Sequence, residues 1–266
     1  MSHLDTLEAI GLDELTERAS RLTRVDRKYL VAASDLDAVV AGLGASTRVL
    51  EIGGLRASSY ESVYFDTDGL ASYLAAARRR RRRFKIRTRT YVDSELCFLE
   101  VKTRGGRSLT VKDRVEHPVA ESASLESDDG YVDFALTEAG IDGVGIDELH
   151  PTLVTRYQRT TLFVPDDDSR ATIDTALGWT VPGGETIETP GLVVVETKSG
   201  STPSPVDRLL WAHGHRPANI SKYGTGMAAI HPELPSNKWR RILDRDLLPA
   251  IVTPASHSDL ERRIAS

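Results

Sequence analysis

The sequence predicts an α+β fold in which about eight mostly antiparallel strands form the main sheet, with helices at its ends and between the strands. Several segments alternate polar and apolar residues with the period of two that is typical of a half-buried strand. The chain contains neither a Gly-x-Gly-x-x-Gly nor a P-loop pattern, and its strands do not alternate regularly with helices. These observations argue against a doubly wound parallel sheet.

The composition allows a sizeable core and shows no targeting signal. The chain has 266 residues, of which 40% are hydrophobic and 27% are charged. No apolar run approaches the roughly 18 residues that a membrane span needs, and the first residues lack the pattern of a signal peptide. Cys97 is the only cysteine, which excludes an internal disulfide and a cysteine zinc cluster. The length allows one large domain or two small ones, and we expect a single domain over residues 1–266. The lone cysteine fits a location in the cytoplasm.

Periodicity and capping residues place the elements along the chain. The expected strands cover residues 24–31, 60–66, 85–92, 95–104, 107–116, 151–164, 170–174 and 192–198. The expected helices cover residues 3–22, 34–43, 70–80, 131–139, 204–213 and 236–248. The segment from about residue 253 is a polar tail.

The two strands that meet at a turn at Asp93-Ser94 show the most distinct charge pattern. Residues two apart in a strand share a face. The residues on one face are Lys85, Arg87 and Arg89 in the first strand and Glu100, Lys102 and Arg104 in the second. This face is therefore dense in cations, with one carboxylate among them. The ordinary alternative is a solvated polar face over an apolar one.

The same arrangement recurs on the other expected strands. The alternating charged positions are Arg24, Asp26 and Lys28; Lys112, Arg114 and Glu116; Arg159; Arg170 and Asp174; and Glu196 and Lys198. If the sheet closes on itself, these residues line its interior. Buried like charges repel and lose hydration, so such an interior favours a bound polyanion, and arginine and lysine both suit phosphate oxygens. A carboxylate among the cations could hold a divalent metal jointly with phosphate.

Residues 78–83 are six consecutive arginines in a chain whose net charge is −5. A mildly acidic chain that concentrates its cations in one zone indicates a local anion site, and we expect no specific nucleic-acid partner. Two interpretations of the run stay open. It could be the solvated end of a helix, where cations complement the helix dipole, or a basic outer patch for a phosphate-rich partner.

Eight short motifs follow one another in order between about residues 24 and 225. They are Arg24-x-Asp-Arg-Lys-Tyr, Tyr64-Phe-Asp, Lys85-x-Arg-x-Arg-x-Tyr, Glu100-x-Lys, Tyr157-x-Arg, Arg170-x-Thr-x-Asp, Glu196-x-Lys and Ser221-Lys-Tyr. Together they resemble the vacuolar transporter chaperone (VTC) domain, which belongs to the triphosphate tunnel metalloenzymes and is CYTH-like. The motifs place the core of the expected domain at about residues 24–225.

The resemblance implies a closed antiparallel β-barrel tunnel of about eight strands with flanking and capping helices. It implies a phosphotransferase, a polyphosphate polymerase that transfers the terminal phosphate of ATP onto a growing chain with Mn²⁺ or Mg²⁺. The implied phosphate-binding residues are Lys28, Arg87, Arg89, Lys102, Arg159, Arg170, Lys198 and Lys222. Among them, Arg87, Arg89, Lys102 and Lys198 are the catalytic candidates. Glu196 is the implied metal ligand, and Glu100 and Asp174 are weaker metal candidates.

One departure from the related sequences separates the alternatives. CYTH triphosphatases and adenylate cyclases open with Glu-x-Glu-x-Lys, whereas this chain has Arg24, Asp26 and Lys28 there. The missing first acid favours the VTC branch. A metal-dependent tunnel triphosphatase and a non-catalytic module for polyphosphate or inositol phosphates stay open as alternatives. The expected partners are ATP, triphosphate or polyphosphate and a separate membrane protein, which would place the chain at the inner face of the membrane.

Overall fold

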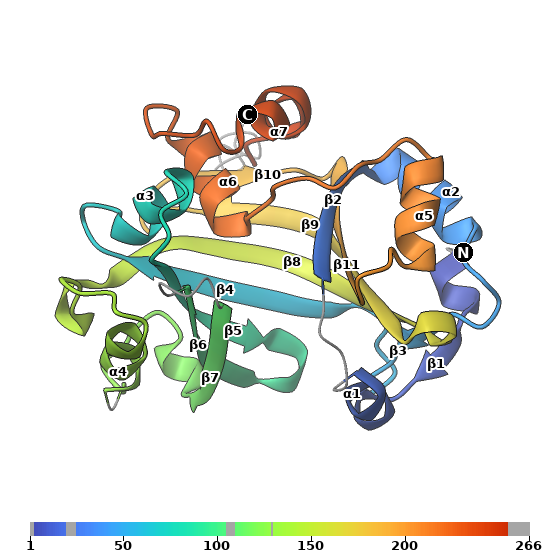
Figure 1. The fold of residues 1–266 in the computed structure, drawn as a ribbon, viewed down its shortest axis with the longest axis horizontal. Coiled ribbons are helices and arrows are strands. Elements are labelled where there is room, and N and C mark those ends of the chain that lie inside the picture. Colours follow the sequence, from blue (N-terminus) through green and yellow to red (C-terminus); the bar gives the residue numbers. More distant parts are fainter. Residues whose placement is uncertain (1–2, 20–24, 105–109, 129, 255–266) are drawn as a thin grey trace, which may run out of the picture.

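The structure is a computed structural model that describes residues 3–19, 25–104, 110–128 and 130–254 (Figure 1). Its strands are β1 (Glu8–Ile10), β2 (Val25–Ala32), β3 (Arg48–Leu50), β4 (Ser58–Asp66), β5 (Arg83–Tyr91), β6 (Leu96–Arg104), β7 (Thr110–His117), β8 (His150–Val164), β9 (Ser169–Thr180), β10 (Thr186–Glu188) and β11 (Leu192–Ser199). Its α-helices are α1 (Leu12–Ala19), α2 (Ala33–Ala41), α3 (Ala71–Ala77), α4 (Tyr131–Glu138), α5 (Pro205–Ala212), α6 (Lys222–Ile230) and α7 (Arg240–Ile242).

One sheet runs through the molecule. Its main path has the order β2-β11-β9-β8-β4-β5-β6-β7, and every pairing along this path is antiparallel. Strand β10 adds to β9, and β3 adds to β8 and pairs in parallel with β1. The predicted α+β class and the mostly antiparallel sheet are confirmed.

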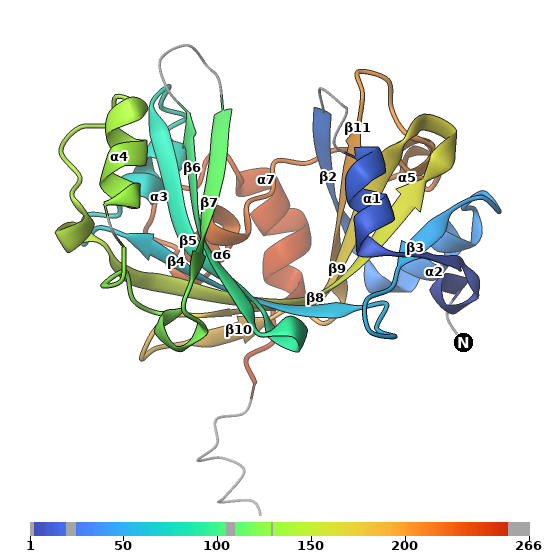
Figure 2. The ribbon, with the colours of Figure 1, turned by 90° about the horizontal axis from the view of Figure 1, so that it is seen from below.

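The predicted closure into a barrel is wrong. Strands β2 and β7 are the two ends of the path, and no pairing joins them within the described ranges. The sheet is instead bent, and β5–β7 and β2, β9 and β11 rise as two walls from a floor made by β4 and β8 (Figure 2). The start of α6 links the walls in place of strand pairing. Ser221 accepts a hydrogen bond from Lys85 of β5, and Lys222 pairs with Asp174 of β9.

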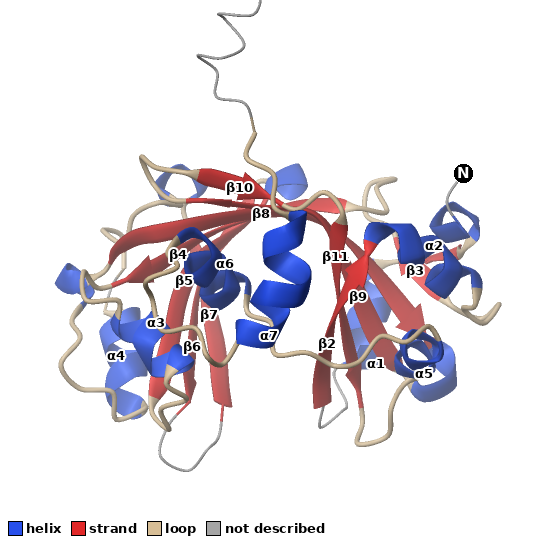
Figure 3. Ribbon diagram, turned by 90° about the horizontal axis from the view of Figure 1, so that it is seen from above, coloured by secondary structure: helices blue, strands red, loops and turns tan. Residues whose placement is uncertain are grey.

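The hydrophobic cores lie on the outer sides of the walls and under α6. Helices α2 and α5 pack against β2, β9 and β11, and α4 packs against β5 and β6 (Figure 3). The third core lies between the floor, α3, α6 and the C-terminal helical segment, and it includes Tyr64, Trp179 and Trp239. Because apolar side chains point outward into these cores, the alternating charged side chains face the space between the walls.

The predicted N-terminal helix over residues 3–22 is wrong in its first half. Residues His3–Thr6 form a 3₁₀ helix, residues 8–10 form β1 and Leu12–Ala19 form α1, while residues 20–22 lie outside the described part. The guanidinium of Arg48 in β3 explains the break. It donates to the carbonyl oxygen of Ala9 at 2.9 Å and to Glu14 at 2.7 Å, so it holds the strand and the helix as separate elements.

The predicted C-terminal helix over residues 236–248 begins later than expected. Helical turns cover residues 240–250, as α7, a π-helical turn at Leu243–Leu247 and a 3₁₀ turn at Leu248–Ala250. Trp239 precedes them and is buried. The tail from residue 255 lies outside the described residues.

Two glycines allow α6 to lie close to two tryptophans. A Cβ atom at Gly224 would lie 2.4 Å from the indole of Trp239, and one at Gly226 would lie 2.2 Å from the indole of Trp179. Trp179 also donates its indole N–H to the carbonyl oxygen of Lys222 at 2.8 Å. This packing fixes the position of the first residues of α6, which reach into the space between the walls.

We therefore expect Gly226→Ala to destabilise the fold by about 2 kcal/mol, because the added methyl group must displace the buried ring of Trp179. The free energy of unfolding, measured by denaturant titration, checks this value. Gly191→Ala is the matched control, since a Cβ atom at Gly191 meets nothing within 4 Å. Equal stabilities of the two variants would contradict the close packing of α6.

Candidate functional site

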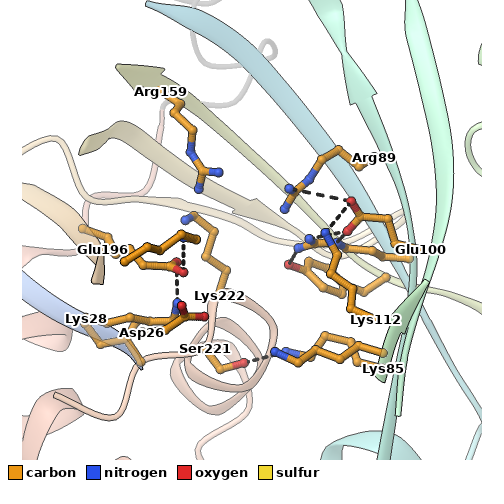
Figure 4. Close-up of a pocket in the computed structure, with 16 residues that line it drawn as sticks. Asp26, Lys28, Lys85, Arg89, Glu100, Lys112, Arg159, Glu196, Ser221 and Lys222 are labelled. Atoms are coloured by element: carbon orange, nitrogen blue, oxygen red, sulfur yellow. Dashed lines mark hydrogen bonds and ion pairs between the residues drawn. The ribbon is translucent and has the colours of Figure 1, made fainter. Parts of the chain in front are cut away.

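A cavity of about 390 Å³ lies between the two walls of the sheet (Figure 4). Nine lysines and arginines line it with only three carboxylates, an excess of six positive charges. The cations are Lys28, Lys85, Arg87, Arg89, Lys102, Lys112, Arg159, Lys198 and Lys222, and the acids are Asp26, Glu100 and Glu196. We refer to this cavity as the groove.

Strand register brings these side chains together from distant parts of the sequence. Lys85 lies opposite Lys102 and Arg87 opposite Glu100 on β5 and β6, as their shared face requires. In the other wall of the groove, Lys28 of β2 lies next to its strand partner, Glu196 of β11. The labelled side chains of the two walls point toward one another, with Ser221 and Lys222 between them (Figure 4).

The structure brings most of the predicted site residues into this groove. Seven of the eight predicted phosphate-binding residues line it, namely Lys28, Arg87, Arg89, Lys102, Arg159, Lys198 and Lys222. Arg170 does not line it. Arg170 of β9 lies opposite Lys198 of β11, so the two side chains are on the same face of the sheet. Of the metal candidates, Glu100 and Glu196 line the groove and Asp174 lies beside it. Arg24, the first charged residue of the predicted strand over residues 24–31, falls outside the described residues. The chemical roles of these residues stay predictions.

Glu100 organises the cations of one wall. Its side chain is 2% exposed and accepts from Arg87 Nε at 2.8 Å, Arg87 Nη2 at 2.5 Å and Lys112 Nζ at 3.1 Å. Arg89 Nη1 lies 3.9 Å from the same carboxylate. Burial alone would raise the pKa of Glu100, but the neighbouring cations outweigh burial and hold this pKa well below its usual range. Glu100 is therefore a fixed anion.

Asp174 fixes two cations at the base of the other wall. It accepts a bidentate pair of hydrogen bonds from Arg159, at 2.6 and 2.8 Å, and it also pairs with Lys222. Despite burial, these two cations keep the pKa of Asp174 well below its usual range. The Arg159 guanidinium lies 5.2 Å from the ring centres of both Tyr60 and Tyr157, which confines it further.

Glu196 lies between two lysines of the same wall. It accepts from Lys198 Nζ at 2.5 Å and pairs with Lys28. The two lysines lower the pKa of Glu196 even though burial opposes them. Asp26 lies opposite Lys198 on the neighbouring strand, so the two acids and two lysines form a compact square.

Two lysines of the groove lack such compensation. Within the described part of the chain, Lys85 and Lys102 form no ion pair, and Lys85 Nζ donates only to Ser221 Oγ at 2.9 Å. Burial and then the positive charges of Arg87, Lys102 and Lys28 lower the pKa of Lys85 to about 8. Burial and then Lys28 lower the pKa of Lys102, and the nearby Asp26 and Glu196 offset this only in part. Both lysines lie where a bound anion would favour their charged form.

Several lining residues had no predicted role, among them Tyr64, Lys85 and Lys112. Strand alternation had already placed the two lysines on the charged faces. Tyr64 was missed because only the register of β4 against β5, which sets it opposite Arg87, places a phenol in the groove. Arg87 Nη1 donates to the Tyr64 hydroxyl at 3.0 Å. Burial would raise the pKa of Tyr64, but Arg87 and Lys85 outweigh it and lower the pKa to about 8.

The carboxylates fit a divalent metal only together with oxygen atoms from a ligand. Among the described residues, no group of three His, Cys, Asp or Glu side chains is arranged to hold a metal ion. Asp26 and Glu196 lie diagonally on adjacent strands, since each opposes a lysine of the other strand. One or two carboxylates with phosphate oxygens are a usual arrangement for Mg²⁺. The donor set therefore suits a metal that is shared with a phosphate chain.

Comparison with known protein families matches residues 23–231 to the VTC domain. This chain belongs to the VTC domain family. The match includes both walls, the floor and α6, and so every residue that lines the groove. No curated protein matches the sequence.

Solved structures similar to this VTC domain share little sequence with it. A candidate adenylate cyclase from Bacillus halodurans is 15% identical, with a TM-score of 0.48 over 75% of this chain and 94% of that one. A candidate adenylyl cyclase from Hippeastrum with a dominant triphosphatase activity is 17% identical, with a TM-score of 0.49 over 81% of this chain and 100% of that one. A protein from Pyrococcus horikoshii is 13% identical, with a TM-score of 0.41 over 76% of this chain and 98% of that one.

The helices of the VTC domain are short. Over the described ranges, none has both the length and the apolar character that crossing a membrane requires.

We expect one tyrosine of the protein to ionise with a midpoint near pH 8, because cations stabilise the Tyr64 phenolate in the folded state. In the unfolded chain the same phenol titrates near pH ~10. The folded state therefore loses this proton first, and its stability relative to Tyr64→Phe rises by about 2 kcal/mol as the pH increases from about 8 to about 10.

The near-ultraviolet absorbance of tyrosinate and denaturant unfolding at several pH values measure the two effects. Tyr64→Phe should remove the early absorbance step, whereas Tyr131→Phe should keep it, since burial raises the pKa of Tyr131 to about 12. An early step that survives Tyr64→Phe would show that another tyrosine ionises there.

Proposed function

We propose that the VTC domain binds a linear triphosphate or polyphosphate in the groove and transfers the terminal phosphate of ATP onto a polyphosphate chain. The observation that carries this proposal is the pair of groove lysines, Lys85 and Lys102, that line the cavity and have no ion pair in the described structure. They lie among nine cations with only three carboxylates. A multiply charged anion that extends along the groove would neutralise this excess, whereas a single small anion would reach only part of it.

The existing ion pairs support binding of phosphate oxygens in particular. Glu100, Asp174 and Glu196 hold the guanidinium and ammonium groups on both walls in fixed directions before any ligand arrives. Such preorganised cations lose little side-chain freedom on binding. Arginine can still donate N–H groups that its carboxylate does not use, and these suit the closely spaced oxygens of a phosphate chain.

The proposed reaction exchanges one phosphoanhydride bond for another. A terminal oxygen of the polyphosphate attacks the γ-phosphorus of ATP, and the bond from that phosphorus to the bridging oxygen of the β-phosphate breaks. The products are ADP and a polyphosphate that is longer by one unit. Because the transferred group carries most of its charge on its equatorial oxygens, the positioned cations of the groove stabilise the transition state. No protein nucleophile takes part.

Glu196 and Asp26 are the residues that would hold a divalent Mn²⁺ or Mg²⁺ in this reaction. Such an ion, when bound, would neutralise charge that develops on the phosphate oxygens. Lys28 and Lys198 orient Glu196 from two sides, so the carboxylate is in place before substrate binds. We also propose that the whole chain acts as one domain, since the single sheet takes strands from residue 8 to residue 199.

We expect Lys85→Gln with Lys102→Gln to weaken the binding of tripolyphosphate about 100-fold, because two uncompensated charges that would contact the ligand are lost. Isothermal titration calorimetry without metal measures the affinity. The matched control is Arg216→Gln with Arg241→Gln, which removes two exposed charges that line no part of the groove. Equal affinities of the two double variants would contradict binding in the groove.

Incubation of the purified protein with ATP and Mn²⁺ tests the chemistry, with polyphosphate resolved on gels and free phosphate measured in parallel. We expect polymer formation that is abolished by Lys198→Ala. Glu196→Gln should lower metal-dependent turnover about 10²-fold or more, because a neutral amide is a poor metal ligand.

The binding of tripolyphosphate without metal should survive in Glu196→Gln, since the change removes a negative charge from the groove. Free phosphate without polymer would indicate a tunnel triphosphatase instead. Tripolyphosphate binding with neither product would indicate a binding module. Full activity of Glu196→Gln would remove this residue from the metal site.

A further inference from the structure

A second cavity of about 200 Å³ lies next to the groove, between the ends of β5 and β6 and the C-terminal helical segment. It shares Lys85, Lys102 and Ser221 with the groove. Its other lining residues are Ala76, Arg83, Phe84, Thr103, Arg104, Thr110, Lys238 and Trp239. With the two shared lysines, five cations line this cavity, and none of its described lining residues is a carboxylate.

The cations of the second cavity are held close together without an anion. Arg83 lies directly opposite Arg104 on β5 and β6, so two guanidinium groups share one face of the sheet. Arg104 Nε is buried and has no hydrogen-bond partner among the described residues, although buried polar groups normally have one. Burial and then neighbouring arginines lower the pKa of both Arg83 and Lys238.

Lys238 reaches this cavity from the C-terminal segment. Its Nζ donates to the carbonyl oxygen of Ala76 at 3.2 Å, and it lies 5.2 Å from the ring centre of Trp239. These contacts fix an ammonium group opposite the arginine pair. The site thus combines positioned cations from three separate segments with a buried donor, Arg104 Nε, for which the described part of the chain offers no acceptor.

We propose that the second cavity binds the continuation of the phosphate chain that occupies the groove. This inference rests on the proposed function. Lys85 and Lys102 line both cavities, so a chain that passes between them would keep contact with cations throughout. The occupant is a row of phosphates and not the base of ATP, because both lining aromatics, Phe84 and Trp239, are 5% and 1% exposed and present no free face for stacking.

The proposal also gives a role to the end of the arginine run. Arg83 is the last of the six consecutive arginines and lines the second cavity, while the side chains of Arg78 to Arg82 are exposed. The exposed arginines would extend the positive potential outward from the cavity and favour the approach of a long polyanion. A short phosphate chain that fits within the groove would not use these groups.

The test compares affinities for ligands of different length, by calorimetry without metal. The ligands are tripolyphosphate, a long-chain polyphosphate and ATP, and the variant is Arg104→Gln with Lys238→Gln. We expect its affinity for long-chain polyphosphate to fall about tenfold or more, while its affinities for tripolyphosphate and ATP stay as in the unchanged protein. Arg216→Gln with Arg241→Gln is the charge-matched control and should bind all three ligands normally.

A second variant, Arg104→Lys with Lys238→Arg, keeps both charges and should retain long-chain binding, which separates lost charge from a disturbed fold. Equal losses for tripolyphosphate and long-chain polyphosphate would overturn the inference, because the cavity would then belong to the groove. A selective loss of ATP affinity would overturn it in favour of a nucleotide pocket, and unchanged affinities would overturn it outright. If the unchanged protein bound no tripolyphosphate, the proposed function itself would fail.

Discussion

Mutual repulsion among closely spaced cations is the constraint on which the rest of this structure depends. Nine lysines and arginines face one another across the groove, and such charges are unfavourable in a partly buried space unless partners or rigid supports hold them. Glu100, Asp174 and Glu196 each compensate two or more cations and leave an excess that a ligand can neutralise. The apolar cores behind the walls supply the stability that the charged groove cannot supply for itself.

Two buried aspartates outside the groove connect those cores to the site. Asp207 of α5 accepts hydrogen bonds from Tyr29 and Thr197, each at 2.6 Å, and so fixes the back of the strands that carry Lys28 and Glu196. Asp66 accepts from the Tyr223 hydroxyl at 2.5 Å, and the Tyr223 ring stacks on Tyr64. Through these contacts α6 is held against the floor, and its first residues stay between the walls.

The distribution of charge has consequences beyond the site. The whole chain has a net charge of −5, yet the groove has an excess of six positive charges, so the remainder of the protein is negatively charged. A field of this shape guides anions toward the groove and disfavours their binding elsewhere on the surface. The second cavity extends the positive region from the groove toward the arginine run, which makes a long phosphate chain a better match than a compact anion.

The sequence by itself determined the α+β class, the eight strands of the main sheet path and the charged faces that meet at the groove, because alternation with a period of two is a local property. It missed β1, β3 and β10, because strands of three residues are too short to show this alternation. Its motifs also led to the VTC domain family and to seven of the eight predicted phosphate-binding residues that line the groove. Only the tertiary structure decided the rest, since register, curvature and helix packing depend on contacts between residues far apart in the chain. Those contacts keep β2 and β7 apart, place Arg170 outside the lining of the groove, and interrupt the predicted N-terminal helix with β1, which pairs with β3 and binds Arg48. They also bring Tyr64 to Arg87 and set Lys238 against Arg83 and Arg104.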